Sequence, residues 1–438
     1  MPSMPNILYI HSHDTGRYIQ PYGHAVATPN LQRLAEQGVL FRQAFTINPT
    51  CSPSRACLLS GECAHSNGML GLAHRGFSMN YEHHIVNTLK AQGYTTALAG
   101  VQHEARGPNA TETIGYDEFL GAPQVAHEKA VEYLDNAPTQ PFFLAVGFFE
   151  THREFPTDPV DDPRYTLPPA PLPDTPDTRQ DMARFKTMAR IYDDKVGQVL
   201  AALERNGLAE NTLVISTTDH GIAFPRMKCN LQDSGTGIML MLRGPGGFTG
   251  GKVVDAMVTH MDVFPTVCEL AGIAPPCWLQ GASLGPVVRG EVEHVHEEIF
   301  FEVNFHASYE PKRAARTDRW KYIRHYDGRT KPVMPNCDDS LSKDVWAAVG
   351  WADRKPDEEQ LYDLVFDPNE TNNLAANPVY SEPLAEMQGR LTAWMKRTND
   401  PLLEHGYVPA PEGARVNDPD GFSPRHDPLP VWEYHKHD

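Results

Sequence analysis

The sequence lacks the marks of several classes of protein. No apolar run approaches the roughly 20 residues that a membrane-spanning helix needs, so we expect no membrane partner. Basic residues are few: 38 Lys and Arg stand against 56 Asp and Glu, which gives a formal net charge of −18. A nucleic-acid-binding protein normally presents a basic face, so we expect no nucleic-acid partner either. Internal repeats and low-complexity tracts are also missing.

Cysteine is sparse and has no framework spacing. Seven cysteines, an odd number, are typical of reduced thiols in a cytoplasm rather than of a disulfide scaffold. Residues 1–5 carry no charged segment followed by an apolar one, so they do not resemble a secretory signal. We therefore expect a cytoplasmic protein. Cys51, Cys57 and Cys63 lie close together, but no second pair follows at the spacing of a zinc finger.

Strands and helices alternate through most of the chain. Predicted strands cover 5–12, 95–99, 141–149, 212–216 and 253–259, and predicted helices cover 29–37, 86–92, 126–135, 181–205 and 262–271. This order predicts an α/β fold with a large, mostly parallel sheet sandwiched by helices. The Pro- and Asp-rich residues 155–178 are expected to form a loop.

The pattern changes after about residue 305. Short antiparallel strands are expected at 313–316, 320–324 and 359–364, with an irregular stretch over 327–358 and a helix over 381–397. We therefore predict a catalytic α/β domain over 1–305 and a smaller C-terminal α+β subdomain over 306–438, whose tail wraps the surface.

Cys51 stands at the expected start of a helix. Pro53 suits the first helical position and Gly61 suits the stop. A helix N-terminus favours an anion, and Arg55, one turn along, would point its guanidinium at the same place. A buried cysteine on a capped helix is the alternative that the residues alone leave open.

Polar residues follow the ends of the predicted strands, where one edge of a parallel sheet would gather them. The candidates are His13, Asp14, Gln102, His103, His152, Asp219 and His220. Carboxylates suit Ca²⁺ or Mg²⁺, whereas added imidazoles favour Mn²⁺ or Zn²⁺. An Asp-His pair after a strand is also common as a turn or a helix cap.

The Cys51-x-Pro53-Ser54-Arg55 motif resembles the signature of the sulfatases, in the alkaline phosphatase superfamily. The resemblance implies that Cys51 is oxidised to formylglycine by a formylglycine-generating enzyme, and that the hydrated aldehyde is the nucleophile. It also implies a divalent metal ion bound by Asp14, Asp219, His220 and Cys51. Members of the family usually bind Ca²⁺, so Ca²⁺ is the expected ion. His13 replaces an aspartate of the family pattern, which makes it a further candidate ligand and keeps Mn²⁺ open.

The resemblance extends to groups that would bind and protonate the substrate. His103, His152 and Lys228 stand where the family keeps such residues, with Arg55 and Lys228 on the sulfate and one histidine as the acid. Val101 replaces a family lysine, so Gln102 or Arg106 would have to compensate.

The substrate is implied by longer stretches. Residues 65–72, 219–225, 302–306 and 316–322 resemble the N-sulfoglucosamine sulfohydrolase branch. The expected substrate is a small saccharide that carries a sulfate ester or sulfamate, with His306 reaching the sugar. A homo-oligomer is compatible with the sequence. The alternatives are a phosphonate monoester or phosphodiester hydrolase, which would share the Asp-His-Gly motif, and a non-catalytic homologue that only binds sulfated sugar.

Overall fold

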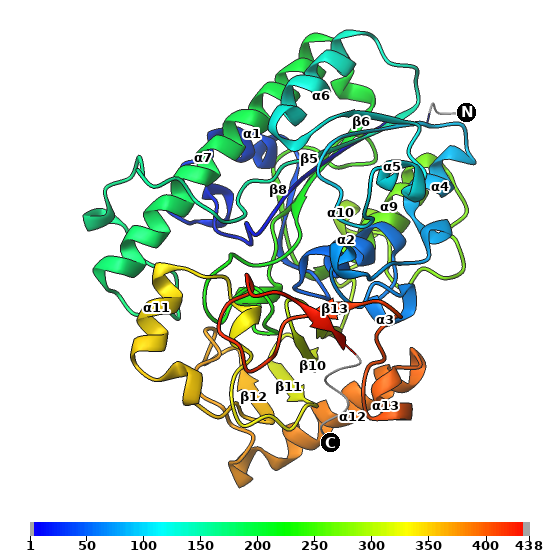
Figure 1. Ribbon diagram of the computed structural model, residues 1–438. Helices are drawn as coiled ribbons and strands as arrows, with labels where there is room; N and C mark the ends of the chain where they lie inside the picture. Colours follow the sequence, from blue (N-terminus) through cyan, green and yellow to red (C-terminus); the bar gives the residue numbers. More distant parts are fainter. Residues whose placement is uncertain (1–3, 432–438) are drawn as a thin grey trace.

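The computed structural model describes residues 4–431, and an eight-stranded sheet organises their larger part (Figure 1). The strand order is β4-β3-β5-β1-β6-β7-β2-β8. The strands are β1 Asn6–Ser12, β2 Val39–Phe45, β3 Thr95–Gly100, β4 Glu118–Gly121, β5 Phe142–Gly147, β6 Thr212–Thr218, β7 Leu240–Arg243 and β8 Lys252–Thr259. All neighbours are parallel except β7, which runs antiparallel to both β6 and β2. The mostly parallel sheet predicted from the sequence is confirmed.

Helices cover both faces of this sheet, as Figure 1 shows. They are α1 Pro29–Gln37, α2 Cys51–Ser60, α3 Ala64–Asn67, α4 Ile85–Lys90, α5 Ala110–Ile114, α6 Ala126–Asp135, α7 Pro176–Arg205, α8 Asp233–Thr236, α9 Val263–Ala271 and α10 Gly285–Arg289. Because side chains alternate along a strand, Ile7 and Tyr9 pack with α2, α4, α9 and α10, whereas Leu8 and Ile10 pack with α1, α6 and α7. Among residues 4–431, no helix combines the length and the apolar character needed to cross a membrane.

The longest helix begins earlier than the sequence pattern indicated. Thr175 caps α7 by accepting the N–H of Thr178, and Pro176 occupies the first turn, where its missing N–H costs nothing. The expected loop over 155–178 therefore ends at Thr175, because Pro and Asp residues that we interpreted as loop are helix-starting residues here.

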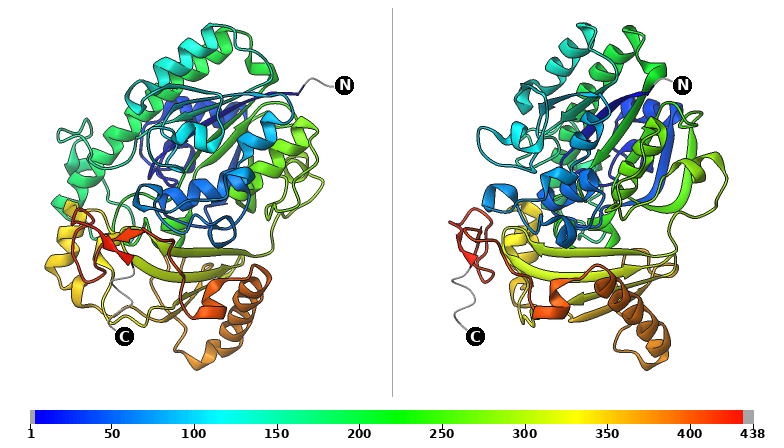
Figure 2. Two further views of the ribbon diagram at one scale, coloured as in Figure 1. Left: turned by 45° about the vertical axis from the view of Figure 1, so that its right-hand side comes forward. Right: turned by 90° about the vertical axis from the view of Figure 1, so that its right-hand side faces the viewer.

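A second, antiparallel sheet lies below the first one in Figure 2, in the order β12-β11-β10-β9. Its strands are β9 Ile299–Phe305, β10 Tyr309–Arg316, β11 Trp320–His325 and β12 Glu359–Asp363. Helix α11 Leu341–Ala348 lies between β11 and β12 in the chain, and α12 Ser381–Arg397 and α13 Pro401–His405 follow β12. Strand β13 Arg415–Val416 pairs with β14 Leu429–Pro430. The small antiparallel sheet expected from the sequence is confirmed. It begins at Ile299, before the boundary expected after residue 305, and the stretch expected to be irregular contains α11.

Candidate active site

The carboxyl ends of four adjacent parallel strands meet at one edge of the large sheet. Strands β3, β5, β1 and β6 are neighbours in that order, and their registers align Gly100 with Gly147 and Ser12 with Thr218. The residues just beyond these ends are His103, His152, His13 with Asp14, and Asp219 with His220. The sheet thus brings together the candidates that sequence order alone kept more than 200 positions apart.

Cys51 is the first residue of α2 and is buried. The helical hydrogen bonds begin at Thr50, whose carbonyl accepts the N–H of Ser54 at 2.8 Å. Pro53 therefore lies in the first turn but not at its first position, contrary to our expectation. Gly61 ends the helix in the left-handed conformation, with φ of +72°, as predicted. Burial raises the pKa of the Cys51 thiol, so the unmodified side chain stays protonated.

Asp219 forms the centre of a buried polar cluster. Its Oδ1 accepts the backbone N–H of Asp14 at 2.8 Å and that of His220 at 3.0 Å. Its Oδ2 lies 3.2 Å from His13 Nδ1. Burial alone would raise the pKa of Asp219, but its interactions with the His220 imidazole and then with the Arg55 guanidinium hold that pKa well below its usual range. Asp219 is therefore an ionised carboxylate.

The cluster fits a divalent cation. His220 Nδ1 must donate its proton to Gly221 O, 2.9 Å away, because a carbonyl can only accept. The lone pair of Nε2 then faces Asp14 Oδ1 at 3.3 Å and Cys51 Sγ at 3.4 Å.

Three buried atoms of the same cluster, Asp14 Oδ1 and both ring nitrogens of His13, make no hydrogen bond within the described residues, although His13 Nδ1 lies 3.2 Å from Asp219 Oδ2. Ligand atoms of His13, Asp14, Cys51 and Asp219 all lie within 4.8 Å of one another. Acceptor atoms that face one another in this way repel unless a cation lies between them.

Arg55 lies behind the cluster. Its Nη2 donates to Asp219 Oδ2 at 3.0 Å and to Ser12 O at 2.9 Å, and its Nη1 contacts His11. The side chain is only 2% exposed. Two of its three nitrogens are therefore engaged with the protein, whereas we expected the guanidinium to point at the anion site.

A family profile described as Sulfatase matches residues 5–273, more than half of the chain. The chain belongs to the sulfatase family. A second profile, described as N-sulphoglucosamine sulphohydrolase, C-terminal, matches residues 227–335, in agreement with the branch that the sequence resembles. Members of the sulfatase family hydrolyse sulfuric esters, so this sulfatase is an enzyme of that class.

Relatives of this sulfatase extend over nearly the whole chain. Human N-sulphoglucosamine sulphohydrolase is 29% identical over 93% of this chain and 92% of its own. An ulvan-active sulfatase from Formosa agariphila is 27% identical over 91% of this chain and 76% of its own. A solved 2-O GAG sulfatase shares the fold with a TM-score of 0.75, at 23% identity over 96% of this chain and 99% of its own. Sulfatases that act on sulfated saccharides are thus among the relatives of this chain.

Lys228 of this sulfatase bridges two carboxylates. Its Nζ lies 3.1 Å from Asp14 Oδ2 and 3.1 Å from Asp338 Oδ2. Burial would lower the pKa of Lys228, but the charges of Asp14 and Asp338 outweigh burial and raise it well above its ordinary value. Sequence reasoning missed Asp338, which lies in the stretch between β11 and α11 that we expected to be irregular.

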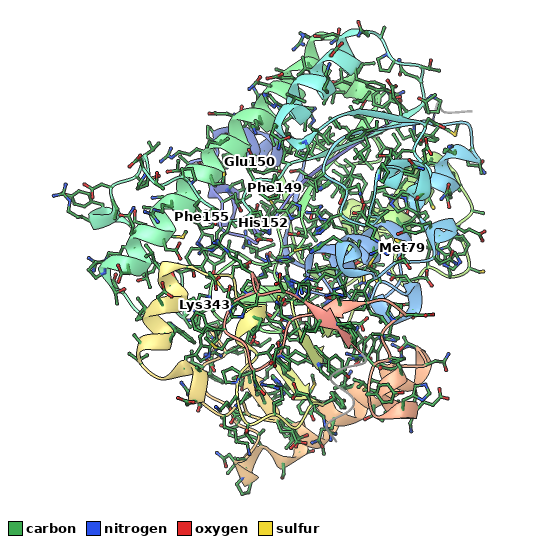
Figure 3. The ribbon with its side chains drawn as sticks, in the orientation of Figure 1. Met79, Phe149, Glu150, His152, Phe155 and Lys343 are labelled. Atoms are coloured by element: carbon green, nitrogen blue, oxygen red, sulfur yellow. The ribbon has the colours of Figure 1, made fainter. Side chains whose placement is uncertain are left out.

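Two histidines flank His13. The ring of His103 lies 5.7 Å from that of His13, and the ring of His152 lies 5.5 Å from it. His103 Nε2 also lies 3.2 Å from Nδ1 of His74, a partner that no sequence motif signalled. Figure 3 shows His152 beside Phe149, and the two rings are 4.9 Å apart. Both histidines of this sulfatase thus border the polar cluster.

The two expected substrate contacts differ in their surroundings. His306 is 9% exposed, its Nδ1 has no hydrogen-bond partner among the described residues, and burial and then Lys228 lower its pKa. It lies near Lys228 and keeps a free ring atom. Gln102, in contrast, uses its side-chain amide locally: it accepts the N–H of Ala105 at 2.8 Å and donates to Ala105 O at 2.7 Å. The amide is thus engaged in its own loop. This geometry does not support the expectation that Gln102 replaces the family lysine whose position Val101 occupies.

Proposed function

We propose that this sulfatase hydrolyses a sulfate ester or a sulfamate on a small saccharide, with a formylglycine made from Cys51 and a bound divalent metal ion. The observation that carries the proposal is the position of Cys51, at the start of α2 and 3.4 Å from His220 Nε2. A nucleophile made at this residue lies against the carboxylates and imidazoles that the four strand ends bring together.

Asp14, Asp219, His220 and Cys51, together with His13, would hold the metal. When bound, the metal polarises a sulfuryl oxygen, and the hydrated aldehyde supplies the attacking hydroxyl. The family favours Ca²⁺, and the imidazoles of His13 and His220 add Mn²⁺ as the second choice.

The remaining steps fall to residues of the chain itself. Lys228 gives two of its three ammonium donors to Asp14 and Asp338, which leaves one for a sulfate oxygen. His103 or His152 would donate a proton to the leaving oxygen or nitrogen, because both rings border the cluster. Arg55 would act by fixing Asp219.

The test begins with peptide mass spectrometry of protein produced together with a formylglycine-generating enzyme. The peptide that contains Cys51 should show conversion of the thiol to the aldehyde, and aryl sulfate turnover should require that conversion. A Cys51→Ala variant is the control and should be inactive. An unmodified thiol at Cys51 in fully active enzyme would refute the proposed mechanism.

A phosphonate monoester or phosphodiester hydrolase is the second candidate, because the Asp219-His220-Gly221 motif would serve both reactions. The same preparation should be given aryl sulfate and aryl phosphonate side by side. Faster turnover of the phosphonate would favour the second candidate, and no turnover of either by converted enzyme would favour a sugar-binding homologue. The cytoplasmic location expected from the sequence stays a prediction, which fractionation of the native host would test.

A further inference from the structure

Asp338 has a place in the site that the proposed mechanism does not use. Its Oδ2 pairs with Lys228 Nζ at 3.1 Å, yet its side chain is 20% exposed, whereas the side chain of Asp14 on the other flank of Lys228 is 0% exposed. Of the two carboxylates paired with Lys228, Asp338 is therefore the one that solvent reaches.

Lys343 holds the residues on both sides of Asp338, through the backbone carbonyl of Cys337 and the side chain of Asp339. This lysine of α11 is completely buried and donates to Cys337 O at 2.7 Å, to Asp339 Oδ1 at 2.9 Å and to Phe422 O at 2.6 Å. All three ammonium donors of Lys343 are thus used. Figure 3 shows Lys343 on α11, below the level of Phe149 and His152.

Asn336 adds a second support on the N-terminal side of Asp338. Asn336 accepts the N–H of Ser308 at 2.8 Å and donates to Glu310 Oε2 at 2.8 Å. These bonds tie the segment to β10 and to the turn before it. A side chain held from both sides in this way is preorganised for binding, since little conformational entropy is lost when a ligand arrives.

The charge of Asp338 works against anion binding. Burial alone would raise its pKa, but the charge of Lys228 and the imidazoles of His152 and His306 outweigh burial and hold that pKa well below its usual range. An ionised carboxylate next to the sulfate-binding lysine repels a sulfate. Such a group can only accept hydrogen bonds, so its natural partners are hydroxyl and amino groups.

An exposed aromatic ring lies beside His152, one of the imidazoles that act on the charge of Asp338. Phe149 is 47% exposed and its ring lies 4.9 Å from that of His152. An exposed aromatic face combined with a few fixed polar groups is typical of small-molecule sites.

We propose that Asp338 determines specificity at the sugar next to the transferred sulfate: it accepts hydrogen bonds from a hydroxyl or amino group on that ring and rejects a second anionic substituent there. The inference rests on the proposed sulfatase function and adds to it the class of substrate, a saccharide with a neutral or cationic group beside its sulfate.

The test compares substrates with and without the recognised group, using full-length enzyme that carries formylglycine. The probes are 4-nitrophenyl sulfate, N-sulfoglucosamine, glucosamine 6-O-sulfate and glucosamine N,6-O-disulfate. Asp338→Asn is the variant. Asp344→Asn is the matched control, because Asp344 is exposed on α11 and also loses one negative charge. Melting temperatures of both variants verify that they fold.

The native enzyme should prefer one of the monosulfated sugars over the disulfate by about tenfold or more in kcat/KM, which is the scale of one hydrogen bond to a charged group. Because Asp338 also pairs with Lys228, Asp338→Asn is expected to change kcat/KM for both kinds of substrate. The expected result is a loss of kcat/KM about tenfold larger for that sugar than for 4-nitrophenyl sulfate, and a smaller preference for the monosulfated sugar over the disulfate. Asp344→Asn should match the native enzyme throughout.

Three results would overturn the inference and leave the proposed function intact. The native enzyme could turn over the aryl sulfate but none of the sugars, or prefer the disulfate. Asp338→Asn could also lower kcat/KM equally for the sugar and the aryl sulfate, which would mean that Asp338 acts only by positioning Lys228. Failure of converted enzyme on every sulfate would instead refute the proposed function itself.

Discussion

Arg55 Nη2 lies 3.0 Å from Asp219 Oδ2, and both side chains are buried. The same nitrogen donates to the carbonyl of Ser12, the last residue of β1. One guanidinium therefore joins the end of β1 to the carboxylate that follows β6, and it fixes the spacing of two strand ends at the proposed metal site.

Replacement of Arg55 by lysine should weaken the link between the end of β1 and Asp219. A single ammonium centre cannot reproduce the planar fork that serves Asp219, Ser12 and His11 at once. We expect the affinity for Ca²⁺ or Mn²⁺ to fall by about 10–100-fold, as is usual when a group that orients a metal ligand is lost. Titration of metal-free protein measures the change. Arg42→Lys, on an exposed arginine, is the control, and an unchanged affinity in Arg55→Lys would contradict the assignment.

His65 and Glu302 form a buried pair, with Nδ1 and Oε2 3.0 Å apart, between α3 and β9. Burial would lower the pKa of His65, but Glu302 outweighs burial and raises it well above its ordinary value. For Glu302 burial would raise the pKa, but His65 lowers it to about 2.

The stability from His65 is therefore full below about pH 6.5 and is lost as pH rises through the raised pKa, whereas that from Glu302 is lost as pH falls below about 4.5. His65→Gln should lower the melting temperature more at about pH 6 than at about pH 10. A loss that does not depend on pH would mean that the ion pair contributes nothing. His405→Gln, on an exposed histidine, is the control.

Gly61 should not tolerate a side chain. Its φ is +72°, and an added Cβ would lie 2.5 Å from Leu279 Cδ2. Gly207 has a similar φ of +68° with nothing within 4 Å of an added Cβ. Gly207→Ala should lower the free energy of unfolding by about 1 kcal/mol from backbone strain, and Gly61→Ala by more. Urea unfolding measures both, and equal losses would show that Leu279 simply moves aside.

Arg313 and Asp400 tie β10 to the start of α13. Arg313 Nε lies 2.6 Å from Asp400 Oδ2 and Nη2 lies 3.0 Å from Oδ1, and both residues are buried. Without Asp400, buried Arg313 keeps Glu302 Oε2 at 3.7 Å but loses both of its short bonds to a carboxylate. Asp400→Ala should therefore lower the free energy of unfolding by roughly 3 kcal/mol, the low end of the cost of breaking a buried ion pair. The double variant Arg313→Met with Asp400→Ala should recover part of that loss. No recovery would indicate that Asp400 acts mainly as the cap of α13.

The parts of the fold that the sequence predicted are those governed by local patterns. Apolar runs at 5–12 and 212–216 predicted β1 and β6, and the polar residues after each run had to share one sheet edge because parallel strands end on the same side. Helix α12 carries the apolar periodicity of an amphipathic helix and occupies the predicted residues 381–397.

What sequence could not predict depends on contacts between distant segments. Asp338 belongs to no strand or motif, and only the folded chain brings it to Lys228, more than 100 residues earlier. Arg55 was placed on the correct helix, but the direction of its guanidinium follows from the carboxylate of Asp219. Gln102 could be predicted near the site, yet its amide serves the backbone of its own loop.

Helix α2 is buried along its whole length, from Cys51 to Ser60. In the folded chain the Cys51 thiol is 2% exposed, so a modifying enzyme that has to surround this residue would not reach it. The oxidation proposed for Cys51 must therefore occur while residues 51–60 are still extended, during or soon after synthesis. If the proposed modification is correct, chains that fold before Cys51 is oxidised would have the same structure but would lack the formylglycine nucleophile.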